Sequence, residues 1–344
     1  MADSTLVLLA ALSLLVGLSA YAVLAGADFG GGVWDLFAAG PRRPDQRAAI
    51  ERAIGPVWEV NHVWIIFVIV VLFTAFPQAF AALCIGLFLP LTFVLLGIVL
   101  RGSAFAFRAH AEGSPALQRR LGLVFSISSL VTPFALGVCA GAVAAGAIEP
   151  AGDGWKTVPV SELLRPFPLL MGLLAVLICS YLAATFLTRE TDGALREDFR
   201  RRAFATGVAL AVVAAVGLVF AADVAPEHSG ELLGGRGLPF ALAALAFGLA
   251  GLVLMARRAW RWVRPVGVAF VLTILWGWAA AQWPYAVTPH LTFEAAASSP
   301  AMLRVYLVCL AVGGVILLPA LWLLFRLFKG GHPEAGRPGA EEGA

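Results

Sequence analysis

The hydrophobic positions fall into long runs, separated by short polar stretches that contain most of the arginines. Each run is long enough to cross about 30 Å of hydrocarbon as an α-helix. Pro77 is expected to force a tight reversal after the second run. The pattern predicts an all-α integral membrane protein, with residues 1–329 as one domain. Nine membrane-spanning segments are predicted, over residues 5–26, 57–77, 79–100, 121–148, 163–187, 203–222, 238–256, 266–283 and 303–328.

The basic residues give this chain an orientation. If the nine helices alternate in direction, 20 of the 24 lysines and arginines fall on the side opposite the N-terminus. The positive-inside rule makes that side cytoplasmic. The N-terminus is then outside and the C-terminus inside. Residues 330–344 are rich in Gly, Pro and Glu and are predicted to form a disordered cytoplasmic tail.

The composition indicates that any functional site lies within or at the edge of the membrane. The chain is 60% hydrophobic and 13% charged, against about 25% charged in a soluble domain. The loops are short, which leaves no sizeable soluble domain, and we expect no nucleic-acid partner. Four cysteines stand alone in apolar stretches without CxxC spacing, so neither a disulfide framework nor a zinc site is expected.

Unusual polar residues open the second predicted helix. Glu59 and His62 are three residues apart and share one helix face, and Asn61 lies between them. An ionisable residue in a span costs about 2.5–3.5 kcal/mol on insertion scales, which makes it a candidate functional residue. An imidazole titrates near neutral pH and suits a proton relay. Asp28 is expected to close the first helix at its cytoplasmic end. The alternative is that Asp28 and Glu59 are partly wet interfacial carboxylates near helix ends.

Aromatic and basic residues surround this region. Trp58 and Trp64 have the character of interfacial anchors. Arg101 and Arg108 either provide the positive-inside signal and complement the helix dipole, or pair with Asp28 or Glu59, or contact a partner subunit.

A haem or nucleotide site is not expected in this chain. Of the five histidines, only His62 lies in a predicted span, so a bis-histidine haem site is disfavoured. The others are placed in loops or the tail: His110, His228, His290 and His332. The Gly-rich run at residues 26–32 lacks the Lys of a P-loop. Its glycines are expected to let the first helix end and turn closely against a neighbour. We expect no catalytic residue and no metal ligand.

The chain resembles subunit II of cytochrome bd-type quinol oxidases across residues 24–108. The resemblance rests on four stretches with matching spacing, which read GADFGGG, IGPVWEVNHVW, LFTAFPQAFAAL and RGSAFAFR. It implies two four-helix bundles plus one peripheral helix, in a bacterial cytoplasmic (inner) membrane. It also implies a heterodimer with a haem-bearing subunit I, in which haems b and d reside, while this chain binds no cofactor firmly. Such a complex oxidises quinol and reduces oxygen to water. Membrane lipid, small single-helix subunits and a structural quinone would be compatible with it.

Subunit II of this family is thought to lend acidic residues to a cytoplasmic proton path. The corresponding residues here are Glu59, His62, Asp28 and Asn61, with Arg101 as their counter-ion. Two positions that are acidic in related proteins are Ala25 and Ala106 in this chain. Two alternatives stay open: a secondary transporter or channel that uses Glu59 and His62, and a structural scaffold.

Overall fold

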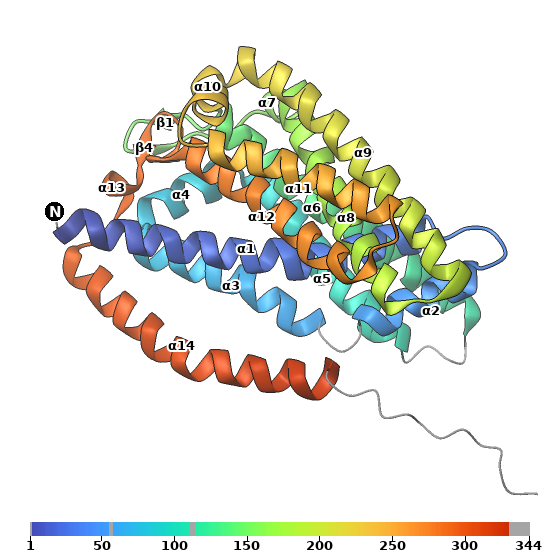
Figure 1. Cartoon of the computed structure of the whole chain (residues 1–344). Coiled ribbons are helices and arrows are strands. Elements are labelled where there is room, and N and C mark those ends of the chain that lie inside the picture. The colour runs from blue at the N-terminus through green and yellow to red at the C-terminus, as the bar shows by residue number, and fades with distance from the viewer. Residues whose placement is uncertain (1, 55–57, 110–113, 330–344) are drawn as a thin grey trace, which may run out of the picture.

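The computed structural model of the chain describes residues 2–54, 58–109 and 114–329 (Figure 1). Its helices are α1 (Ala2–Leu36), α2 (Arg43–Ile54), α3 (Trp58–Ala75), α4 (Pro77–Gly86), α5 (Phe88–Ala109), α6 (Pro115–Ala144), α7 (Val160–Leu163), α8 (Pro166–Glu190), α9 (Gly193–Val224), α10 (Pro226–Gly234), α11 (Leu238–Ala256), α12 (Trp260–Gln282), α13 (Phe293–Ala296) and α14 (Pro300–Lys329). Two small antiparallel hairpins pair β1 (Pro150–Ala151) with β2 (Gly154–Trp155), and β3 (Tyr285–Val287) with β4 (Leu291–Thr292).

The described residues contain eight helices that are long and apolar enough to cross a membrane: α1, α5, α6, α8, α9, α11, α12 and α14. α3 and α4 make a ninth span if they are counted as one broken helix. The chain is therefore an integral membrane protein. The ninth span and the orientation of the termini stay predictions.

The first helix extends beyond the predicted end at residue 26. α1 continues to Leu36, through the whole Gly-rich run. The prediction that Asp28 closes this helix is therefore wrong, because two more turns follow it. Glycine weakens a helix in water, but within a bilayer no solvent competes for the backbone hydrogen bonds.

The predicted span 79–100 is also divided differently. Residues 77–86 form α4, which is bent by 120° from α3, and α5 begins at Phe88. Pro77 has no N–H to continue the ladder of α3, so the helix breaks there. Ser298 satisfies carbonyl groups at the break: its N–H donates to Ala75 O (2.8 Å) and its hydroxyl to Thr74 O (2.7 Å). The break is thus supported by the segment that leads into α14.

α1 lies at the centre of the helix packing. It contacts α3, α6, α8 and α12, while α5 packs on α6, α9 on α8, and α11 on α12. α14 runs along the outside, beside α1 and α3, and the hydroxyls of Tyr306 and Ser13 lie 2.6 Å apart (Figure 1). The N-terminus lies at the same end of the molecule as β1, β4, α10 and α13, and α2 lies at the opposite end (Figure 1).

Candidate functional site

A stripe of buried polar side chains runs along α1. Tyr21, Asp28 and Asp35 follow one another at intervals of seven residues, and all three are buried. Residues seven apart share one face of a helix and lie about 10.5 Å apart along its axis. A charge buried within a membrane span is costly unless a neighbouring group neutralises it. The chemistry open to Asp28 and Asp35 therefore depends on the side chains around them.

Two glycines bring α1 very close to its neighbours at this level. A Cβ on Gly30 would lie 1.9 Å from the carbonyl oxygen of Cys179 in α8. A Cβ on Gly32 would lie 2.1 Å from the Ser129 hydroxyl in α6. The Gly-rich run therefore serves close helix packing, as small residues do in membrane proteins, and not the end of a helix.

Arg101 of α5 is the largest fully buried side chain, and it is 1% exposed. Its Nε donates to the Ser129 hydroxyl at 3.1 Å. The guanidinium lies over the rings of Phe29 and Phe125, 5.0 and 5.1 Å from their centroids. Asp28 interacts with it electrostatically. The buried Arg101 cation thus lies near the Asp28 carboxylate, in a region with few other polar groups.

Asp35 forms a second charged cluster at the α2 end of the stripe. One carboxylate oxygen lies 3.4 Å from Arg47 Nε and 3.7 Å from Arg108 Nη1. The other accepts a 2.9 Å hydrogen bond from the Ser126 hydroxyl. Arg108 also reaches Glu51, at 3.7 Å. The ion pairs described for Arg108 therefore involve Asp35 and Glu51, and not Asp28 as the sequence suggested.

Sequence reasoning missed Asp35, although a signal was present. Asp35 follows Asp28 by seven residues, which matches the helical repeat. The prediction that the first helix ends at residue 26 removed Asp35 from that face and left it in a loop. Only the continuation of α1 to Leu36 puts both carboxylates on one stripe.

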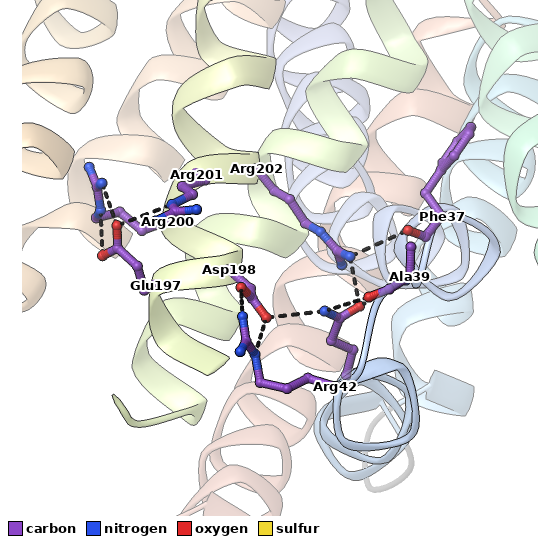
Figure 2. Close-up of polar contacts among 9 residues, drawn as sticks. Phe37, Ala39, Arg42, Glu197, Asp198, Arg200, Arg201 and Arg202 are labelled. Carbon is purple, nitrogen blue, oxygen red and sulfur yellow. Dashed lines mark hydrogen bonds and ion pairs between the residues drawn. The ribbon is translucent and has the colours of Figure 1, made fainter. Parts of the chain in front are cut away.

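A set of polar contacts fixes α2 against the start of α9 (Figure 2). Arg42 and Asp198 form a bidentate ion pair, with N–O distances of 2.6 and 2.8 Å. Gln46 donates to the same carboxylate at 3.1 Å and accepts from Arg202 at 2.7 Å. Arg202 also donates to the carbonyl oxygen of Phe37 at 3.3 Å. The contacts hold α2, and with it Arg47, in place over the end of α1.

Several predicted site residues cannot be placed. The side chains of Trp58, Glu59, Asn61 and His62 lie outside the described residues, so their roles stay predictions. Trp64 is described: it packs against the buried cluster of Tyr21, Ala25, Phe29 and Cys179. Trp64 is partly buried there, and its role as an interfacial anchor stays a prediction.

The two positions where an acid is replaced differ in their surroundings. Ala25 is fully buried within the same cluster as Phe29, while Ala106 is exposed on α5. A carboxylate at position 25 would place a charge in the interior, and the Ala25 methyl group packs there instead.

A separate cavity of about 380 Å³ lies among α8, α9, α11 and α12. Its lining is almost entirely apolar and includes Met171, Leu210 and Phe270. The side chains with polar atoms that line it are Tyr181, His228, Thr273 and Trp278. His228 Nδ1 and Trp278 Nε1 are both buried without a hydrogen-bond partner in the described part of the chain. An apolar cavity with a few polar groups is typical of a ligand site.

His228 was expected in an external loop, but it lies in a helix. It belongs to the short helix α10 and is only 6% exposed. Burial lowers its pKa to about 4, so the imidazole is neutral at neutral pH. Within the described ranges, no three His, Cys, Asp or Glu side chains gather as a metal site.

The chain is similar in sequence to subunits of known oxidases. Cytochrome bd ubiquinol oxidase subunit 2 of Bacillus subtilis (strain 168) is 32% identical over 180 residues, which is 52% of this chain and 52% of that one. Cytochrome bd-I ubiquinol oxidase subunit 2 of Escherichia coli (strain K12) is 32% identical over 202 residues, which is 57% of this chain and 52% of that one. The matched part of the chain thus spans about half the length of these relatives.

The fold and the family extend over nearly all of the chain. The structure of bd oxidase from Geobacillus thermodenitrificans contains a chain of the same fold, with a TM-score of 0.79 and 24% identity, over 94% of this chain and 98% of that one. The family model described as cytochrome bd terminal oxidase subunit II matches residues 6–328. Because this match covers every described span, the chain belongs to the cytochrome bd terminal oxidase subunit II family.

Proposed function

We propose that this chain is the non-haem accessory subunit of a cytochrome bd-type terminal oxidase in a bacterial inner membrane. It pairs with a haem-bearing subunit I, which holds haems b and d, and the complex oxidises quinol and reduces oxygen to water. The N-terminus lies outside and the C-terminus in the cytoplasm. The family match over residues 6–328 is the observation on which this proposal rests.

Purification through a tag on this chain tests the pairing. We expect a haem-bearing membrane protein to co-purify, with a haem spectrum in the complex and none in the chain alone. A secondary transporter is the second candidate, because broken helices such as α3–α4 are found in transporters. Purification without any haem-bearing partner would favour the transporter.

The chain's own contribution is a proton path from the cytoplasm toward the oxygen site. Glu59 takes up the proton, His62 and Asn61 relay it, Asp28 lies farther along, and Arg101 balances the charge. The burial of Asp28 beside Arg101 supports this path, since a buried carboxylate with a neighbouring cation can exchange a proton only with other buried groups or bound water.

Glu59→Gln is expected to slow oxygen reduction at saturating quinol by about tenfold, because glutamine cannot bind and release the proton. Haem content and assembly stay at wild-type levels. Oxygen consumption of the purified complex measures the effect. Glu149→Gln is the matched control, since this exposed glutamate lies in the loop after α6, far along the chain from the path. Unchanged turnover in Glu59→Gln removes Glu59 from the path.

We also propose that a structural quinone occupies the cavity among α8, α9, α11 and α12. The apolar walls suit its isoprenoid tail. Trp278 Nε1–H can donate to one of its carbonyl oxygens, and His228 can donate from Nδ1 in the tautomer that has the proton there. Binding would satisfy both buried polar atoms.

Gly217→Leu is expected to exclude this quinone. Gly217 lines the cavity, and a Cβ at this position meets no atom within 4 Å, so a larger side chain projects into open space. Lipid extraction followed by mass spectrometry measures quinone per complex. Gly313→Leu in α14 is the control, because its Cβ is also unobstructed but lies away from the cavity. Equal quinone in both variants contradicts this site.

A further inference from the structure

We propose that protons enter this subunit at Asp35, and pass along the contact between α1 and α6, through Ser126 and Ser129, to Asp28. This inference rests on the proposed proton path and gives it an entry that is separate from Glu59. Asp35 acts as a proton carrier, and the two serines act as relays.

A gradient of exposure leads to Asp35 from the α2 end. The side chain of Glu51 is 49% exposed, that of Arg47 31%, that of Arg108 19% and that of Asp35 2%. Glu51 contacts Arg108, and both arginines contact Asp35. A chain of charged groups thus connects the wet surface to a fully buried carboxylate. If the charges served only to anchor α2, the ion pair of Arg42 and Asp198 would already do so.

The next step runs inward from Asp35 along α6. The Ser126 hydroxyl donates to Asp35, and Ser129 lies three residues farther, on the same helix face. Ser129 accepts a hydrogen bond from Arg101, which interacts electrostatically with Asp28. Asp35, Ser126, Ser129, Arg101 and Asp28 therefore form one polar seam at the junction of α1, α5 and α6, bordered by the apolar rings of Phe29 and Phe125.

The chemistry along the seam is proton exchange alone. A proton from cytoplasmic water binds the Asp35 carboxylate and passes on to the Ser126 hydroxyl, which is within hydrogen-bond distance. A serine hydroxyl accepts one proton and gives up its own, so it returns unchanged. Water completes the steps between hydroxyls that do not touch, and the Asp28 carboxylate receives the proton. Asp35 is left as the carboxylate, ready for the next proton.

Asp35→Asn in the complete oxidase complex tests this entry. Asparagine keeps the acceptor for Ser126 but cannot carry a proton, so we expect oxygen consumption and proton uptake from the cytoplasmic side to fall about tenfold. Asp35→Glu restores most of the rate. Asp192→Asn is the matched control: it removes the ion pair with Arg196, its carboxylate is 91% exposed and lies outside the seam, and we expect wild-type turnover.

The outcomes separate this inference from the proposed function. Slow turnover in Asp35→Asn with rescue by Asp35→Glu supports the entry. Wild-type turnover in Asp35→Asn, with slow turnover in Glu59→Gln, overturns the entry and leaves the proposed path intact. Wild-type turnover in both variants overturns both. If Asp35→Asn fails to assemble, Ser126→Ala decides, because it keeps both ion pairs: slowed proton uptake supports the seam, and wild-type uptake overturns it.

Discussion

Gly30→Ala is expected to prevent the accumulation of folded protein in the membrane. The added Cβ would lie 1.9 Å from the carbonyl oxygen and 2.4 Å from the carbonyl carbon of Cys179. These are backbone atoms of α8, so no side-chain rotation can relieve the clash, and the two helices must separate. We expect a loss of at least about 3 kcal/mol, the upper end of the usual cost of overpacking.

Fluorescence-detected size-exclusion chromatography and thermal melting in detergent measure this loss. The matched control is Gly217→Ala, the same substitution within α9, where a Cβ meets no atom within 4 Å. Alanine there should leave yield and melting at wild-type levels, because the added methyl group meets no neighbouring atom. Wild-type yield and melting of Gly30→Ala would show that α1 and α8 are less closely packed than the structure has them.

Arg101→Met is also expected to destabilise the protein strongly. The substitution keeps an unbranched side chain between the rings of Phe29 and Phe125 but removes the buried charge. The Asp28 carboxylate then loses its buried neighbouring cation. Breaking a buried charge pair from one side costs about 3–5 kcal/mol, so the variant should assemble poorly and melt early.

A double variant separates charge from packing. Arg101→Met combined with Asp28→Asn removes both charges, and we expect it to recover much of the stability lost in Arg101→Met alone. Arg101→Lys keeps the charge but loses the planar stacking, and it should fall between Arg101→Met and the wild type. If the double variant is no more stable than Arg101→Met, the charge of Asp28 is balanced by other groups.

The candidate site was only partly accessible to prediction. Asp28 and Arg101 stood out because they are charged residues at the ends of predicted spans and lie within the stretches that carry the family resemblance. Asp35 did not, because it follows a Gly-rich run that reads locally as a helix end. His228 was assigned to a loop for a similar reason: it lies in a short polar segment, and only packing against α12 and the cavity shows that it is buried.

By itself the sequence determined that this chain is a helical membrane protein, where most of its spans lie and which family it resembles. These properties follow from local composition, because a bilayer requires each span to be apolar and to satisfy its own backbone. Only the tertiary structure decided that α1 continues to Leu36, that residues 77–86 form a helix separate from α5, and that Asp28 and Asp35 share a seam with Arg101. Those features depend on contacts between helices far apart in the chain, such as α1 with α8 and Ser298 with α3, which no local pattern encodes.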